Sequence, residues 1–377
     1  MSTGLIAEIY PLSKELRAIG SSVSILFPSG KGSFLKMDLN ENTTAPLFKP
    51  LGKRITLNHE LHESISTFLY TVEGIIIPPV FRLSDLILSL QEVRFSKGEF
   101  DAVISFKPWF RTAIPTLKIA SLLNIPSVLW LDDYDISPHS IFLKKFSGLT
   151  TIVSYLKHIY VNQNVHYMPY PVEDHIISDS RFILQKKPSH PNIICIFPST
   201  GYSESEAISI LRSISMMRHP MTINVIFSPF SILRSQCAPS FENQIVKIHF
   251  IDWMTRDNYL NFLEQQDIAI VLQPNNNYGK GKNSIRMLEC MAKGIPVIAP
   301  DLGDVAETIR QARCGLLAKP GDAQSYLQCL AELVSDLTLS LTLGRNGIEF
   351  MRKRSWRENA LNFLEFLEST KTTTMRR

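Results

Sequence analysis

Short apolar runs alternate with amphipathic stretches along most of the chain. Within each run the apolar residues are continuous, so both faces of the predicted strand should be buried. Such runs separated by helical stretches are typical of parallel sheets covered by helices. They fall in two groups, residues 22–28, 101–106, 126–132, 149–154 and 165–169, then residues 192–198, 222–228, 245–251, 267–272 and 295–299. The grouping predicts an α/β protein with two doubly wound parallel sheets.

Two prolines, Pro169 and Pro171, mark the expected boundary between the groups. Proline resists both a helix interior and a central strand, so the chain should leave regular structure there. We therefore expect an N-terminal domain over residues 1–171 and a C-terminal domain over residues 172–344. Residues 31–58 are polar with weak periodicity and are predicted to form a long loop region.

The most apolar window, residues 113–131, contains a lysine and two prolines. A membrane span of about 20 residues should be cleaner than this. The window instead predicts a buried helix, a turn at Asn124 and a buried strand. At the other extreme, residues 370–377 are polar and are expected to be disordered.

Composition narrows the function classes. The chain has 377 residues, of which 45% are hydrophobic and 20% charged, as in an ordinary globular protein. A net charge of +4 is far from the concentrated basic footprint of a nucleic-acid-binding protein. Five cysteines without a CxxC pair, scattered histidines and no signal peptide indicate a cytosolic protein with reduced thiols and no structural metal. The basic residues near position 352 favour a solvated helix face, with a membrane-surface contact as the alternative.

Residues 278–300, YGKGKNSIRMLECMAKGIPVIAP, carry the clearest chemistry. A strand over residues 267–272 should lead into an Asn- and Gly-rich loop, then into a helix over residues 284–293. Asn283 is a suitable N-cap, and Gly294 ends the helix. The helix N-terminus would then lie at the carboxyl end of a parallel strand, where free N–H groups and the helix dipole favour anions.

The side chains around this helix start favour a nucleotide diphosphate. Gly281 and its neighbouring glycine allow a close backbone approach, and Lys280 and Lys282 supply charge that suits phosphate. Glu289, one and a half turns into the helix, can accept hydrogen bonds from a ribose diol. The alternatives are a solvated glycine–lysine turn and a structural ion pair of Glu289 with Arg286 or Lys293.

Two familiar phosphate motifs fit poorly. The stretch lacks the upstream glycine of a Walker loop. Residues 279–284 followed by Asp301 resemble a dinucleotide fingerprint, but the third glycine is missing and the unit lies late in its domain. A nicotinamide-dependent enzyme is therefore the weaker reading.

Residues 267–320 resemble the C-terminal domain of GT-B glycosyltransferases of the retaining family 4 type, the glycosyl transferases group 1. The matching positions are Leu288, Glu289, Cys290, Met291, Ala292, Gly294, Pro296, Val297, Ile298, Gly303, Glu307 and residues 315–317 and 320–322. Residues 343–346 and 355–356 fit the family's closing helices, and residues 101–135 resemble its N-terminal segment. The resemblance implies two Rossmann-like domains facing a cleft, with a helix over residues 345–369 crossing back to the first domain.

The resemblance also implies roles for individual residues of the C-terminal domain. Glu289 matches the second glutamate of the family's E-x7-E motif, which binds the nucleotide ribose. The first glutamate, which would touch the donor sugar, falls at Gly281. The backbone at Ser284 and Ile285 matches positions that hold the diphosphate, and Trp253 matches the place where the base rests.

Further donor residues follow from the same comparison. The family's usual Arg and Lys are missing from residues 198–204, and Lys280 and Lys282 are hypothesised to replace them. Asn283, the predicted N-cap, and Gly4 are also counted among the donor-binding residues.

In the N-terminal domain, Asp132 aligns with a position near the acceptor and the donor sugar, which makes it the candidate catalytic residue. An N-cap cluster or an acidic patch formed with Asp133 and Asp135 is the alternative. Gly4 matches a family glycine pair that follows a first, central strand. Because only three residues precede Gly4, that strand is expected to be missing, and the natural start is hypothesised to lie upstream.

Taken together, the resemblance implies a glycosyltransferase that uses a nucleotide-diphosphate sugar and needs no metal or other cofactor. The expected setting is cell-envelope polysaccharide or glycoconjugate synthesis in the cytoplasm, with a glycan or lipid-linked acceptor and possible peripheral contact with the inner membrane face. The alternative is an impaired or truncated relative that binds a nucleotide or a partner without transfer.

Overall fold

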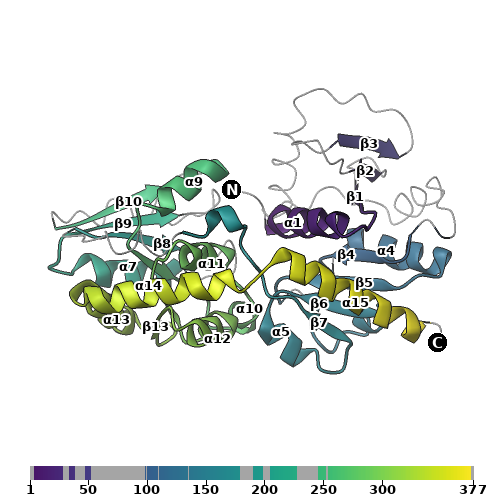
Figure 1. Ribbon diagram of the computed structural model, residues 1–377. Helices are drawn as coiled ribbons and strands as arrows, with labels where there is room; N and C mark the ends of the chain where they lie inside the picture. The colour runs from purple at the N-terminus through teal and green to yellow at the C-terminus, as the bar shows by residue number, and fades with distance from the viewer. Residues whose placement is uncertain are drawn as a thin grey trace. The chain divides into compact units, whose positions relative to one another are not determined.

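The structure is a computed structural model. It describes residues 4–28, 34–38, 47–51, 98, 100–108, 110–134, 136–178, 190–197, 204–226, 245–251 and 254–374. Contacts divide the chain into two compact units. The N-terminal unit comprises residues 2–152, 157–169 and 356–377, and the C-terminal unit comprises residues 153–156 and 170–355. Each unit contains a parallel sheet with helices packed on it (Figure 1).

A four-stranded parallel sheet, in the order β4-β5-β6-β7, forms the centre of the N-terminal unit. Its strands are β4 (Val103–Phe106), β5 (Ser127–Leu131), β6 (Gly148–Thr151) and β7 (Val165–Tyr167). The helical elements are α1 (Gly4–Ala18), α4 (Phe110–Leu123), η1 (Leu143–Lys145), α5 (Ser154–Ile159), which is shared between the units, and α15 (Trp356–Thr374). Strand β5 is buried along its whole length, as expected for a central strand.

Helix α15 belongs to this unit although it closes the sequence. Phe363 on the helix is fully buried and meets Trp130 of β5 edge to face, with 6.4 Å between ring centroids. Phe366 stacks on His166 of β7 at 5.0 Å. Aromatic contacts of this kind add to the free energy of burial, so they fix the last helix on the first sheet.

The C-terminal unit contains a six-stranded parallel sheet in the order β10-β9-β8-β11-β12-β13. The strands are β8 (Asn192–Ile196), β9 (Met221–Ile226), β10 (Val246–Ile251), β11 (Ile268–Val271), β12 (Val297–Pro300) and β13 (Gly315–Ala318). The order reverses direction between β8 and β11. In open α/β sheets, such a switch point is where ligands bind, beyond the carboxyl ends of the strands.

Helices cover this second sheet. They are η2 (Asp174–Ile176), α7 (Glu204–Ser215), α9 (Arg256–Leu263), α10 (Asn277–Lys280), α11 (Ile285–Ala292), α12 (Gly303–Ala312), α13 (Ala323–Ser335) and α14 (Leu337–Arg352). Buried aliphatic side chains from β8, β9 and β11 meet those of α7 and α13 in one hydrophobic core. None of the helices among the described residues is both long enough and apolar enough to cross a membrane.

Most of the predicted strands and the parallel α/β class are confirmed, with local corrections. Strand β1 (Ser24–Pro28) pairs antiparallel with β2 (Phe34–Asp38), which pairs with β3 (Leu47–Leu51), so residues 31–58 are not simply a loop. β13 (Gly315–Ala318) was not predicted as a strand, and only its last residue is fully buried, unlike the central strands of the sheet. The helix at Ala113 and the strand at β5 are as expected, and Asn124 makes the turn with a positive φ of 56°.

The closing region is two helices rather than one over residues 345–369. Helix α14 ends at Arg352 and belongs to the C-terminal unit, and α15 begins at Trp356. Helix α15 continues to Thr374, and Thr370 is fully buried, so the expected disorder is wrong for residues 370–374, whereas residues 375–377 lie outside the described residues. The prediction failed because this segment is mostly polar, although one face of the helix is buried.

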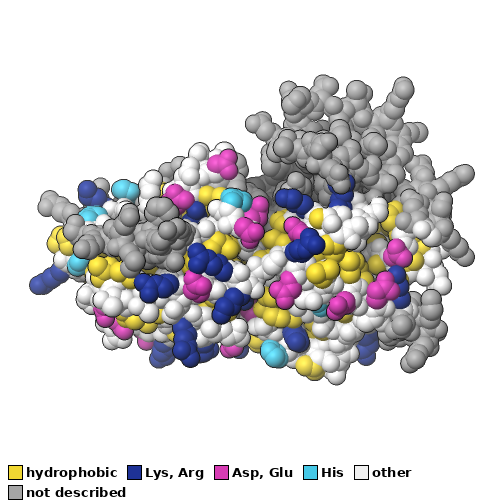
Figure 2. Space-filling view, in the orientation of Figure 1, with side chains coloured by type: hydrophobic (Ala, Val, Ile, Leu, Met, Phe, Trp, Pro, Cys, Tyr) yellow, Lys and Arg dark blue, Asp and Glu magenta, His cyan; other side chains and the backbone are white. Residues whose placement is uncertain are grey.

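The basic residues near position 352 have structural partners. Arg352 binds Glu349 at 2.7 Å and the carbonyl oxygen of Ser178 at 3.2 Å. Arg354 donates to the carbonyl oxygen of Tyr170 at 3.2 Å. On the face shown in Figure 2, Lys and Arg side chains are interspersed with acidic ones rather than gathered in a single stripe. These contacts favour the solvated-helix interpretation.

Candidate functional site

The loop after β11 is built by two local contacts. The side chain of Asn276 caps α10 by accepting a hydrogen bond from the Gly279 N–H at 2.9 Å. A Cβ atom at Gly279 would overlap the carbonyl oxygen of Pro274. The glycine at 279 therefore lets the loop pack on its own backbone, rather than on a ligand as the sequence suggested.

Helix α11 begins directly beyond this loop. Its N-cap is Ser284, whose Oγ accepts from the Met287 N–H at 3.3 Å, so the expected cap at Asn283 is wrong by one residue. The remaining N–H groups of the first turn have no partner within the helix. They lie just beyond the carboxyl end of the buried strand β11, which is the arrangement that favours a bound anion.

The two lysines of the loop differ in their surroundings. Lys282 donates to the Tyr278 hydroxyl at 2.9 Å, and its Nζ lies 5.0 Å from the centroid of the same ring. Lys280 is the last residue of α10 and is partly exposed. Both lysines precede the start of α11 in the sequence, and Gly281 between them is buried. Their charge adds to the field of the helix dipole.

Glu289 lies in the middle of α11 and is only 2% exposed. Of the two ion-pair partners considered for Glu289, Arg286 and Lys293, the latter forms an ion pair with Glu264 at 2.7 Å. A buried carboxylate needs hydrogen-bonding partners, and ionised carboxylates are rarely buried without a structural or functional reason. Glu289 lies about one turn and a half after the start of α11, and its role toward a ribose stays a prediction.

Two buried amide side chains lie beside the helix start. Gln273 follows β11, is 2% exposed and donates through Nε2 to the Lys282 carbonyl oxygen at 3.2 Å. Within the part of the chain that the structure describes, its Oε1 has no hydrogen-bond partner. Asn283 is 7% exposed, and neither its Oδ1 nor its Nδ2 has a described partner. Sequence analysis missed Gln273, although a polar residue at the end of an apolar run was a signal.

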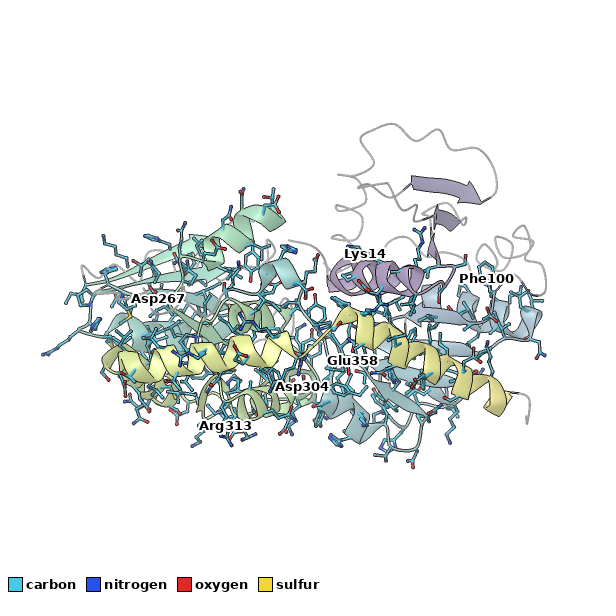
Figure 3. The ribbon with its side chains drawn as sticks, viewed as in Figure 1. Lys14, Phe100, Asp267, Asp304, Arg313 and Glu358 are labelled. Carbon is cyan, nitrogen blue, oxygen red and sulfur yellow. The ribbon has the colours of Figure 1, made fainter. Side chains whose placement is uncertain are left out.

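Helix α12 supports the loop from the side. Gly303, its first residue, has a φ of 55°, and a Cβ atom there would overlap the backbone of Lys280. The next residue, Asp304, is buried at the start of α12 (Figure 3). Its Oδ1 accepts from the N–H and the hydroxyl of Ser154, at 2.6 Å each. Burial raises the pKa of the Asp304 carboxyl, although these hydrogen bonds oppose the shift.

The candidate catalytic residue, Asp132, lies at the end of β5 in the N-terminal unit. The ammonium group of Lys107, which follows β4, forms ion pairs with Asp132 and with Asp133, the latter at 3.0 Å. Lys107 has a φ of 70°, an unusual backbone conformation for a residue other than glycine. A lysine therefore partly neutralises the two acids, and no helix follows them directly, so the N-cap alternative is wrong.

The remaining predicted residues divide between the units. Gly4 is the first residue of α1 in the N-terminal unit. Lys280, Lys282 and the residues from Asn283 to Glu289 are together in the C-terminal unit. Trp253 lies outside the described residues, as do Asp135 and most of the loop after β8. Lys107 was not predicted as a site residue, because its left-handed backbone and its pairing are properties of the fold.

Comparison with known proteins shows what part of the C-terminal unit resembles. Residues 232–336 match the family "Glycosyl transferases group 1". An uncharacterized glycosyltransferase of Methanocaldococcus jannaschii is 28% identical over 115 residues, which are 30% of this chain and 31% of the relative. A D-inositol 3-phosphate glycosyltransferase of Corynebacterium urealyticum is 22% identical over 33% of this chain and 28% of the relative. The chain thus spans about a third or less of these curated relatives.

Solved structures match over more of the chain. Sucrose-phosphate synthase from Thermosynechococcus elongatus superposes with a TM-score of 0.59 at 12% identity, over 80% of this chain and 82% of that one. Anabaena HepE in complex with UDP and glucose gives a TM-score of 0.58 at 14% identity, over 77% of this chain and 84% of that one. At such identities the likeness concerns the fold, and it confirms the expected GT-B architecture.

Proposed function

We propose that this chain, which belongs to the group 1 glycosyltransferases and has the GT-B fold, transfers a sugar from a nucleoside-diphosphate donor to a glycan, lipid or other acceptor. Transfer would proceed with retention of anomeric configuration and without a resident metal. The acceptor would belong to cell-envelope polysaccharide or glycoconjugate synthesis. The protein would act in the cytoplasm, peripherally at the inner face of the membrane where the acceptor is lipid-linked.

The observation that carries this proposal is the buried Glu289 on a helix that starts at the switch point of the second sheet. The helix N-terminus favours the diphosphate, and a carboxylate about one and a half turns further can accept from a ribose diol. The UDP bound to the structural neighbour HepE is the same class of ligand.

The proposed chemistry is mainly electrostatic. Negative charge develops on the diphosphate as the bond to the sugar breaks. The first-turn N–H groups of α11, with Lys280 and Lys282, would stabilise that charge more strongly in the transition state than in the ground state. Asp132 would act at the reacting sugar, with Lys107 fixing the orientation of its carboxylate.

Thermal unfolding with UDP, GDP, ADP, NAD or buffer tests the donor site. A ligand at 100 times its dissociation constant adds about 2.7 kcal/mol to the free energy of unfolding. We expect one nucleoside diphosphate to raise the melting temperature, and Glu289→Ala to remove most of that rise. Glu307→Ala, on the exposed face of α12, is the matched control and should keep the response. Stabilisation by NAD alone would contradict the proposal.

Gly281 favours a second candidate function. It occupies the position where the family's first glutamate would contact the donor sugar, so the chain could bind a nucleotide without transferring a sugar. Release of the nucleoside diphosphate from the matching nucleotide sugar, with and without candidate acceptors, distinguishes the two. Binding without any transfer or hydrolysis would favour the second candidate.

A further inference from the structure

Beside the start of α11, Gln273 and Asn283 present three buried polar atoms that have no partner among the described residues. An amide that is buried without hydrogen bonds costs about 1–3 kcal/mol, so such groups usually have a ligand or an ordered water. Resting on the proposed function, we propose that Gln273 and Asn283 form a subsite that hydrogen-bonds a hydroxyl group of the donor's sugar. The subsite replaces, with neutral amides, the carboxylate that is absent at Gly281.

The order of residues along α11 supports this position. Glu289, the candidate ribose contact, lies five positions after the N-cap Ser284, about 7.5 Å along the helix axis at 1.5 Å per residue, and Asn283 immediately precedes that cap. The first-turn N–H groups, which suit the diphosphate, lie between the two. A nucleotide sugar has the same linear order of ribose, diphosphate and sugar, so its sugar would reach Asn283 and Gln273.

The chemistry of the two amides fits a hydroxyl group. An amide side chain offers both a donor and an acceptor, and a hydroxyl group needs both. In this site Gln273 Nε2 is already used by the Lys282 carbonyl oxygen, which leaves one acceptor there. Among the residues that the structure describes, neither the donor nor the acceptor of the Asn283 amide has a partner. Neutral amides also accept a sugar hydroxyl without adding negative charge beside the diphosphate.

The same unit contains a matched control. Asn224 and Gln266 are also buried amides, at 6% and 1% exposure, but Asn224 Nδ2 donates to Gln266 Oε1 at 2.9 Å. Gln266 also donates to the Phe262 carbonyl oxygen at 3.0 Å. This pair supplies its own hydrogen bonds, so removing one member should damage the unliganded protein. Removing Asn283 should not.

The experiment measures binding of a nucleoside diphosphate and of its sugar conjugate by calorimetry. The probes are UDP with UDP-glucose, GDP with GDP-mannose, and ADP with ADP-glucose, tested on wild type, Asn283→Leu, Gln273→Met and Asn224→Leu. For the pair that binds, we expect Asn283→Leu to weaken the sugar conjugate on the order of 10- to 100-fold and the free diphosphate by less than about 2-fold. Gln273→Met should act in the same direction and serves if Asn283→Leu fails to fold.

Melting temperatures of the unliganded variants complete the test. Asn283→Leu should be unchanged or more stable, whereas Asn224→Leu should be less stable. If Asn283→Leu lowers the melting temperature as Asn224→Leu does and leaves sugar binding intact, the amides hold a structural water and the inference is overturned. If both Asn283→Leu and Gln273→Met weaken UDP and UDP-glucose equally, the amides contact the diphosphate and the inference is also wrong. Absence of wild-type binding to every diphosphate would instead overturn the proposed function and this inference with it.

Discussion

The carboxyl ends of the two parallel sheets carry different charged and polar groups. At the end of β11, the C-terminal unit places a helix N-terminus, two lysines and two neutral amides with unused hydrogen-bonding capacity. At the ends of β4 and β5, the N-terminal unit places two carboxylates, Asp132 and Asp133, that both pair with Lys107. One strand end therefore presents groups that suit an anionic ligand, and the other presents two carboxylates paired with a lysine. Under the proposed function, the donor would bind at the first strand end and Asp132 would act from the second.

The largest expected difference between the two strand ends comes from replacing Asp132. Asp132→Asn keeps the size of the side chain but removes its charge and basicity, so transfer should fall on the order of 100- to 10,000-fold. Affinity for the nucleoside diphosphate should stay within about 2-fold, because the donor residues belong to the other unit. Initial rates and calorimetric binding check both parts. Asp101→Asn, an exposed acid of the same unit that pairs with Lys371, is the control and should leave both values unchanged.

The next largest effect is on the free energy of unfolding, which should depend on pH in opposite ways through His166 in the N-terminal unit and Asp304 in the C-terminal unit. Burial, helped by nearby Lys157, lowers the pKa of His166 to about 4 from an ordinary value near 6.5. A folded-state pKa below the unfolded value means that stability is full above about pH 6.5 and is lost as the pH falls toward 4. The loss should reach at most about 3 kcal/mol, since one pKa unit corresponds to 1.36 kcal/mol.

Asp304 in the C-terminal unit should respond in the opposite sense. Its raised pKa means that the folded state holds the proton more tightly, so its contribution grows as the pH falls and is lost as the pH rises through its folded value. Urea unfolding of wild type, His166→Leu and Asp304→Asn between pH 7 and 4 checks both signs. The acid loss should become shallower in His166→Leu and steeper in Asp304→Asn, and parallel curves for all three would contradict the prediction.

The smallest expected effects come from replacing one lysine at each strand end, Lys107 and Lys282, by methionine. Lys107→Met leaves two partly buried carboxylates without their shared cation and should lower the free energy of unfolding by about 2 kcal/mol. Lys282 binds a neutral tyrosine hydroxyl, so Lys282→Met should lower it by less than about 1 kcal/mol but weaken diphosphate binding several-fold. Denaturant unfolding and calorimetry measure the two effects. Equal losses of stability would show that the two strand ends are alike.

Much of the fold could be predicted because buried parallel strands have continuous runs of apolar residues in the sequence. The run at β5 and the turn at Asn124 are examples, since few other structures accommodate them. The corrections concern elements whose pairing is not encoded locally. Strand β1 pairs with a neighbour across a polar stretch, and α15 hides one buried face in a polar segment. In both places tertiary contacts outweigh local pattern.

The candidate site was predictable only in part. Glu289 and the two lysines lie close together in the sequence, so local spacing was enough to group them. Gln273 and Lys107 could not be singled out in that way. The importance of Gln273 depends on which hydrogen bonds the folded chain leaves unmade, and that of Lys107 on two strand ends meeting. Both depend on contacts that form only in the folded chain, so no single stretch of sequence shows them.

The contact between Gly303 and the backbone of Lys280 has a consequence for motion. Because no side chain separates the two segments, the loop before α11 cannot rise without moving the start of α12. The loop and the first turn of α12 should therefore open as one cooperative unit, and their slowly exchanging amide hydrogens should exchange with deuterium at a common rate. A donor would then bind to a rigid loop. A change in donor preference would come from substitutions of side chains rather than from movement of this loop.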